Sequence, residues 1–306
     1  MSTLYTQEAS NVRKTWLLMT FFLVIIIVLG LVLSTVFNNP NILYIAFILS
    51  ILLNVGSYWF SDKLVLSMAH ATQIENKNDY PELWNIVENL SITAGLPMPR
   101  LYVIDDPAPN AFATGRNKEH SVIAVTTGIL PLLNKSELEG VIAHELSHIG
   151  NRDMLVQTVV VVFAGIISLV ADIALRASLW SSDERKSPIA FVAVIAGVIL
   201  APLAAMIIKL AISRQREFLA DASGALLTRY PEGLASALQK ISNFHQPMKV
   251  QNSAIAHLYI SSPTGVNDLS DVREHEKISW IAKLFMTHPP TEDRVQALLQ
   301  NKAVDK

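Results

Sequence analysis

Apolar residues fall into four long blocks along the chain, and none of these blocks contains a charged side chain. The first block covers residues 15–37 and the second covers residues 38–60. Each is long enough to cross a hydrocarbon core of roughly 30 Å as a helix. The segment Asn38-Asn39-Pro40-Asn41 predicts a turn between them. The two blocks therefore predict a transmembrane hairpin.

A cleaved signal peptide is the alternative interpretation of the first block. A signal core has about 7–15 apolar residues, however, and this block is longer. No clear small-x-small cleavage site follows it, whereas a second apolar block does. A membrane anchor is the simpler interpretation.

Two later blocks cover residues 154–171 and 187–208. Both are rich in valine and isoleucine and lack a polar face at helical spacing, which is typical of helices surrounded by lipid or protein. Buried helices of a large soluble core are the alternative, because about 18 residues is close to the lower limit for a span. We favour a second transmembrane hairpin.

Between the two pairs of blocks, shorter segments predict a small soluble domain. Residues 80–94 have helical periodicity, and Gly95 is a natural stop for that helix. Strands are predicted over residues 101–104, 110–114 and 121–126. We expect these strands to form a small antiparallel sheet.

The helix that follows has a predicted start and end. Ser136 with Glu139 fits a capping box, and Gly150 with Asn151 fits a helix end. Later in the chain, we expect helices over residues 214–221 and 234–241, a polar loop over residues 261–271, and a last helix that begins after residues 287–291.

Composition and charge support a membrane protein. The chain is 51% hydrophobic and only 16% charged, against roughly 25% charged residues in a typical soluble domain. Arg13 and Lys14 precede the first block and the turn after it is uncharged, so the N-terminus and everything after the second block are expected in the cytoplasm. The absence of cysteine fits a reducing compartment. A net charge of -2 without a basic cluster argues against a nucleic-acid partner.

The candidate chemistry lies in the segment His144-Glu145-Leu146-Ser147-His148. Histidines four residues apart on a helix share a face, so both imidazoles can reach one metal ion. The glutamate between them then lies beside a metal-bound water. This arrangement predicts a zinc peptidase in which His144 and His148 bind zinc and Glu145 is the general base.

A catalytic zinc needs three protein ligands and one open position. Glu217 and Asp221 lie on one face of a predicted helix, so that one can bind zinc while the other holds a ligand histidine. A merely charged helix face is the alternative. If both later blocks span the membrane, His148 and Glu217 return to the same side, and the zinc lies close to the membrane surface.

Three further motifs accompany the histidine pair, and the four together are specific. They are Glu217-x-x-x-Asp221, Asn110-Ala111-Phe112-Ala113-Thr114-Gly115 and Thr287-His288-Pro289-Pro290. The chain resembles, over nearly its whole length, the HtpX family of membrane zinc metalloproteases, relatives of the CAAX-prenyl endopeptidases within the gluzincins. The resemblance implies an α+β, mainly helical fold with four transmembrane helices in two hairpins and a cytoplasmic gluzincin-type domain.

The resemblance also assigns roles to individual residues. It implies one Zn²⁺ per chain held by His144, His148 and Glu217, with Glu145 as general base and Asp221 behind a ligand histidine. An edge strand that lines the cleft, where a substrate adds as an extra strand, matches Asn110, Ala111, Phe112 and Ala113.

His288 has two open interpretations. It is either a capping or buried histidine at the start of the last helix, or a donor to the oxyanion of the tetrahedral intermediate. Arg294, on that helix, can support either role.

The expected organisation alternates membrane and catalytic segments. The parts are residues 1–14 (cytoplasmic), 15–60 (first hairpin), 61–153 (first part of the catalytic domain), 154–212 (second hairpin) and 213–306 (second part, with the third ligand).

The expected function is that of a multi-pass, integral cytoplasmic (inner) membrane endopeptidase. Its substrates would be polypeptides, namely misfolded or damaged membrane proteins and also unfolded proteins, in membrane protein quality control. Rival interpretations are a transporter or scaffold with a structural zinc, a non-catalytic membrane adaptor, and a CAAX-prenyl-type endopeptidase. Structural zinc sites usually have four protein ligands, often cysteines, and a dedicated prenyl-peptide enzyme typically has more membrane spans.

Overall fold

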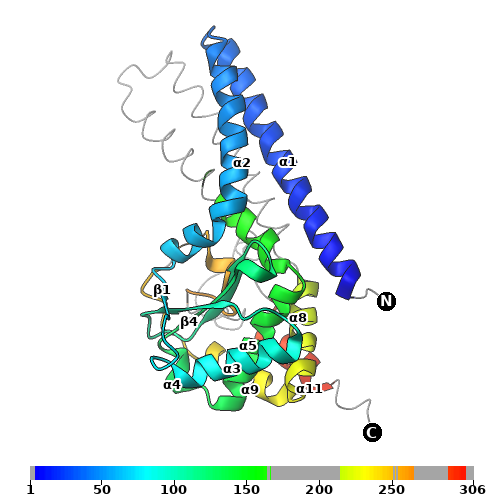
Figure 1. Ribbon diagram of the computed structural model, residues 1–306, viewed down its shortest axis with the longest axis vertical. Helices are drawn as coiled ribbons and strands as arrows, with labels where there is room; N and C mark the ends of the chain where they lie inside the picture. Colours follow the sequence, from blue (N-terminus) through cyan, green and yellow to red (C-terminus); the bar gives the residue numbers. More distant parts are fainter. Residues whose placement is uncertain are drawn as a thin grey trace, which may run out of the picture.

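The computed structural model describes residues 4–163, 166, 214–250, 252, 254–264 and 289–300. A pair of long helices rises from a compact body of helices and one small sheet (Figure 1). The pair consists of α1 (Leu4–Val36) and α2 (Asn41–Met68). Asn38 adopts a left-handed conformation with φ 48° between them. The predicted hairpin and its turn are therefore present, although α1 also includes most of the segment expected to precede the first span.

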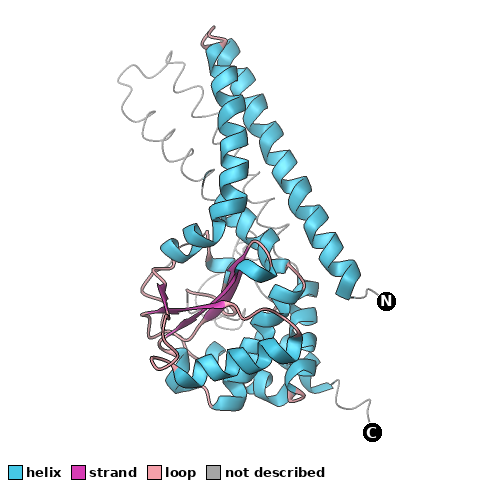
Figure 2. Ribbon diagram, in the orientation of Figure 1, coloured by secondary structure: helices cyan, strands magenta, loops and turns pink. Residues whose placement is uncertain are grey.

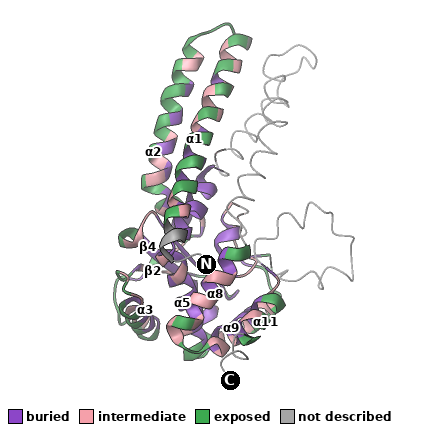
Figure 3. Cartoon of the chain, turned by 90° about the vertical axis from the view of Figure 1, so that its right-hand side faces the viewer, coloured by how far each residue is buried: buried purple, intermediate pink, exposed green. Residues whose placement is uncertain are grey.

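These two helices are long and apolar enough to cross a membrane. The candidate spans are Ala9–Thr35 and Asn41–Met68, and 18-residue windows within them have mean hydropathies of 3.0 and 1.8. Their outer faces are exposed (Figure 3) and carry large apolar side chains such as Trp16, Leu17 and Leu52. A soluble protein would leave this surface in water, so the exposure favours a lipid environment.

Only the beginning of the second predicted hairpin can be compared with the structure. Asp153–Phe163 is an apolar helix that starts directly after the motif helix. The rest of the block over residues 154–171, except residue 166, and the whole block over residues 187–208 lie outside the described residues.

The sheet, drawn in magenta in Figure 2, has four strands in the order β1-β2-β4-β3. β2 runs parallel to β4, whereas β1 pairs antiparallel with β2 and β3 pairs antiparallel with β4. The prediction of an antiparallel sheet was therefore wrong, because β4 lies between β2 and β3. Strand patterns locate strands but do not fix which strands pair. The strands are β1 (Thr72–Gln73), β2 (Arg100–Ile104), β3 (Ala111–Gly115) and β4 (Ser121–Thr126).

The predicted helices of the soluble part are confirmed, with small shifts at their ends. Gly95 ends the first of them with φ 64°, in the left-handed conformation that a glycine adopts without strain. The described helices here are α3 (Pro81–Ala94), α4 (Ile129–Leu132), α5 (Lys135–Gly150), α8 (Arg214–Thr228), α9 (Pro231–Ser242) and α11 (Thr291–Gln300), with short 3-10 turns at η1 (Lys118–His120) and η2 (Ala256–Leu258).

The capping box of α5 lies two residues earlier than predicted. Asn134 Oδ1 accepts a hydrogen bond from the Glu137 backbone N–H at 3.0 Å, and Glu137 Oε2 accepts one from the Asn134 N–H at 2.8 Å. Glu137 also accepts bonds from Ser236 and Lys240 of α9. Both pairs of residues satisfy the local pattern, so the contacts with α9 explain which one forms the cap.

α5 is the central helix of the body, and α8 approaches it very closely. A β-carbon at Gly224 would lie 2.9 Å from the backbone nitrogen of His144. Only glycine permits this approach, which brings α8 against the motif. The close packing therefore determines how near the carboxylates of α8 come to the histidines of α5.

We expect Gly224→Ala to lower the free energy of unfolding by about 1–3 kcal/mol, because the added methyl group forces the two helices apart. The loss should exceed the gain of about 1 kcal/mol in helix propensity. Thermal unfolding of the detergent-solubilised protein measures the effect. Gly150→Ala in α5 is the control, since its nearest contact would be Leu96 Cδ1 at 3.9 Å. Equal or greater stability of Gly224→Ala would contradict the packing argument.

Candidate metal centre

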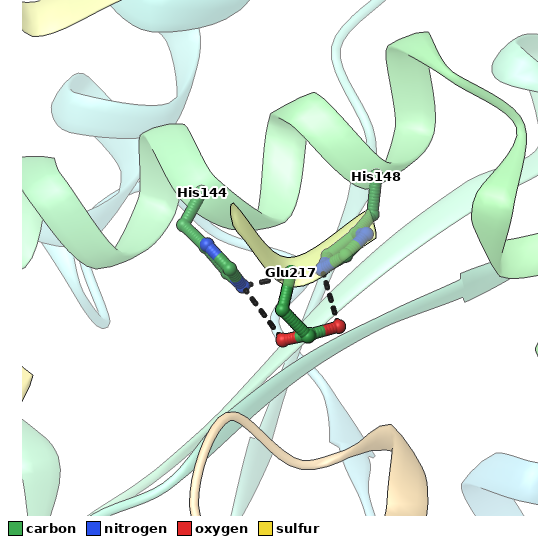
Figure 4. A group of neighbouring side chains, drawn as sticks. All are labelled: His144, His148 and Glu217. Atoms are coloured by element: carbon green, nitrogen blue, oxygen red, sulfur yellow. Dashed lines mark hydrogen bonds and ion pairs between the residues drawn. The ribbon is translucent and has the colours of Figure 1, made fainter. Parts of the chain in front are cut away.

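Three side chains converge between α5 and α8 (Figure 4). His144 and His148 project from successive turns of α5, and Glu217 faces them from α8. The two Nε2 atoms lie 3.1 Å apart. Glu217 places one oxygen 3.8 Å from Nε2 of His144 and the other 3.7 Å from Nε2 of His148. All three side chains are buried.

The other ring nitrogen of each histidine faces an aspartate. His144 Nδ1 lies 2.9 Å from Asp221 Oδ1, and His148 Nδ1 lies 3.3 Å from Asp153 Oδ2. Protons on the Nδ1 atoms leave a lone pair on each Nε2 atom, directed toward the other ring and Glu217. Three electron-pair donors that face one another in a buried space can share one cation. The donor set therefore fits a divalent metal with nitrogen and oxygen ligands, and each aspartate can orient one ligand.

Asp221 is held in turn by the last described helix. Arg294 of α11 donates from Nε to Oδ2 at 2.8 Å and from Nη2 to Oδ1 at 2.7 Å, in a bidentate pair. Burial acts against the charged carboxylate, but Arg294 outweighs it and lowers the pKa of Asp221 to about 2. Asp221 therefore stays ionised beside His144. The predicted role of Asp221, which is to hold the ring of a ligand histidine, requires this charge.

Glu145 lies between the two histidines in sequence and is also buried. Burial raises its pKa to about 7, and the negative charge of Glu217 acts in the same direction. His148 and a hydrogen bond with the backbone of Ala113 oppose the shift. A carboxylate with a pKa near neutrality is suited to take and return a proton at physiological pH.

The predicted edge strand lies beside Glu145, and its residues have different surroundings. β3 is at the edge of the sheet, and the backbone of Ala113 bonds Glu145. The Ala111 carbonyl already accepts a bond from the Ile260 N–H at 2.9 Å. The Asn110 amide donates to the Ser261 carbonyl at 2.9 Å, and Phe112 is packed edge-on against Tyr259. Asn110 and Ala111 thus anchor the segment around residue 260, while Ala113 is the part of β3 nearest the candidate base.

Comparison with known proteins identifies the family. Residues 77–302 match peptidase family M48. The chain belongs to this family. Protease HtpX homologs resemble it over almost their whole length. The homolog of Tropheryma whipplei is 44% identical over 301 residues, which cover 96% of this chain and 97% of the homolog. The homolog of Pyrococcus furiosus is 45% identical over 290 residues, which cover 93% of this chain and 94% of the homolog. The predicted resemblance to the HtpX family is confirmed.

A solved structure shows the same fold at a greater distance. The crystal structure of Ste24p from S. mikatae matches 96% of this chain and 67% of its own, with a TM-score of 0.50 and 20% sequence identity. At this identity the likeness concerns the fold alone. The chain is thus a protease of the M48 family with a mainly helical body.

Three residues around this M48 site were not predicted as parts of it. Asp153 and Asn11 were assigned no role, and Arg294 was linked to His288 rather than to Asp221. A carboxylate directly before an apolar block was an available signal for Asp153, because a charge at such a position is costly without a partner. His288 itself lies outside the described residues.

The two histidines of the M48 motif differ in proton affinity. Burial lowers the pKa of His144. Burial also acts against a charged His148, but its hydrogen bond with Asp153 and the charge of Glu217 raise its pKa to about 9. A metal that binds Nε2 must therefore displace a proton from His148 at neutral pH.

We expect the apparent affinity for Zn²⁺ to rise about tenfold per pH unit between about pH 6.5 and pH 8.5, because one proton leaves His148 when the metal binds. Competition with a chelator of known pH dependence measures this slope. Ca²⁺ should not compete at equal concentration, because it prefers oxygen ligands. A pH-independent affinity in this range would contradict the raised pKa of His148.

Proposed function

We propose that the chain is a membrane-integrated, zinc-dependent endopeptidase that hydrolyses peptide bonds. The observation that carries the proposal is the convergence of His144, His148 and Glu217 with their ligand atoms all within 4.8 Å of one another. Glu145, with its pKa near 7, follows directly after the first of them. Membership of family M48 and the similarity to HtpX proteases support the same activity.

In this proposal, His144, His148 and Glu217 hold one zinc ion per chain. A zinc ion bound there supplies a Lewis acid that activates a water and polarises the scissile carbonyl. Asp221 and Asp153 keep the protons of the two histidines on Nδ1 and leave Nε2 free for the metal. The site is buried, which limits competing bulk water.

Glu145 acts on protons in the proposed reaction. Its carboxylate takes a proton from the attacking water and then delivers it to the leaving amine nitrogen. The outer edge of β3 near Ala113 is the proposed place for the substrate backbone, which would add to the sheet as a further strand. The hydrogen bond of the Ala113 backbone to Glu145 supports this placement, because it aligns the strand edge with the base.

We expect Glu145→Gln to reduce peptide cleavage by about 10²–10⁴-fold, because the amide cannot take the proton of the water. The variant should retain bound zinc, since Glu145 is not one of the ligands. Cleavage of an unfolded protein and of the chain itself, with zinc content read on the same samples, tests both statements.

Glu139→Gln is a matched control, because it changes a partly exposed glutamate of the same helix. It should leave cleavage unchanged. Loss of zinc from Glu145→Gln would reassign Glu145 as a ligand, and undiminished cleavage would reject it as the base.

We further propose that the enzyme is an integral protein of the cytoplasmic membrane whose catalytic body faces the cytoplasm. The two apolar helices support membrane insertion, and Arg13 and Lys14 in the N-terminal part of α1, before its uncharged stretch, support this orientation. A metal site beside these helices suits misfolded or damaged membrane proteins as substrates. A non-catalytic adaptor is disfavoured, because the base and all three candidate ligands are present.

The orientation can be tested with single cysteines, because the natural chain has none. A membrane-impermeant maleimide added to intact cells should label Asn39→Cys, in the turn between α1 and α2. It should label Ile92→Cys, on the exposed face of α3, only after the membrane is opened. The reverse pattern would place the catalytic body outside.

A further inference from the structure

The carboxylate of Asp153 connects a candidate metal ligand with the first long helix. One oxygen, Oδ2, lies 3.3 Å from Nδ1 of His148. The other, Oδ1, accepts a hydrogen bond from Nδ2 of Asn11 on α1. Asn11 Nδ2 also donates to the carbonyl of Asn151 at 3.0 Å, directly after the end of α5. Asn11 and Asp153 are each only 1% exposed.

Asp153 depends on these contacts because it is buried. A carboxylate without water is costly unless donors replace its hydration. Among the described residues, the side chains that approach it are His148, Asn11 and, at 3.9 Å, Arg216 Nε. The Asn11 bond to Oδ1 fixes the orientation of the carboxyl group, and this orientation directs Oδ2 to His148.

α1 is packed along the helix that begins at Asp153. The buried face of α1 consists of Asn11, Thr15, Leu18, Met19 and Phe22 at helical spacing. Its apolar members contact Leu155, Val156, Val159, Val160 and Phe163. The rings of Phe22 and Phe163 are stacked with centroids 3.8 Å apart. Asn11 thus lies at the end of an apolar interface, where a single polar contact can fix the register of two helices.

We propose that Asn11 is a positioning residue for the metal site and acts on His148 through Asp153. This inference rests on the proposed function. Both histidines are held by an aspartate, but the aspartates are held differently. Arg294 forms an ion pair with Asp221 at 2.7 Å within the body, whereas Asp153 accepts its hydrogen bond from the neutral amide of Asn11 on α1 and has Arg216 Nε only at 3.9 Å. Correct seating of α1 is therefore a condition for a well-ordered His148.

The test uses Asn11→Leu in the full-length protein in lipid nanodiscs. Leucine has a similar size but cannot donate a hydrogen bond. The apparent Zn²⁺ affinity, measured by chelator competition, should fall about tenfold, which is within the range for residues that orient metal ligands. Thr15→Val is the matched control one turn along the same buried face, because among the described residues the Thr15 hydroxyl donates only to the backbone carbonyl of Asn11, within α1, and does not contact Asp153. It should leave zinc affinity unchanged.

A double-mutant cycle separates positioning from general damage. Asp153→Asn should itself weaken zinc binding by about 10–100-fold. In that background, Asn11→Leu should add less than about a twofold loss, since residues that act through one another are not additive. An equal loss in both backgrounds, the same loss from Thr15→Val, or no loss at all would overturn the inference. Wild-type protein that binds no zinc would instead overturn the proposed function, and this inference with it.

Discussion

The structure depends on a buried cluster of two histidines and three carboxylates. These side chains lie on α5, on α8 and at the start of the helix that follows α5. Each of these groups is costly to bury alone, and each becomes acceptable through its neighbours. Asp221 stays ionised because Arg294 faces it, and His148 favours its proton because Asp153 and Glu217 face it. The facing Nε2 atoms and Glu217 then form a donor set that a divalent cation completes. The rest of the body holds this set in place.

Packing supplies the precision that the charges alone do not. α8 lies so close to α5 that a β-carbon at Gly224 would have no room beside His144. This close contact determines how near the Glu217 carboxylate comes to the two histidines. Glu137 connects the start of α5 to Ser236 and Lys240 of α9. β3 adds the backbone of Ala113 beside Glu145. Three separate elements, α8, α9 and β3, thus constrain α5 around the candidate metal-binding motif, which makes the site rigid.

Local features of the fold could be predicted from the sequence, and non-local ones could not. The spacing of His144 and His148 placed them on one face, and the spacing of Glu217 and Asp221 placed two carboxylates on another helix. The strand order was missed, because the parallel pairing of β2 with β4 depends on the path of the chain between these two strands and not on the local pattern of either. The cap at Asn134 was missed because α9 decides between two local candidates. The contact between Asn11 and Asp153 joins residues 142 positions apart, which no periodicity reveals. The roles of the metal-facing residues remain predictions.

The two aspartates suggest why one chain combines apolar helices with a buried metal site. Arg294 binds Asp221 through two charged hydrogen bonds, so Asp221 is held firmly without any contact from α1. Asp153 instead accepts a hydrogen bond from the neutral amide of Asn11, and Arg216 Nε lies 3.9 Å away, so this carboxylate is held more weakly than Asp221. Its geometry relies on the apolar contacts of α1 with the helix that begins at Asp153. A shift of α1 along this interface would misplace Asn11 before it disturbed any metal ligand directly. The apolar helix α1 and the candidate metal ligands are therefore parts of one packed unit.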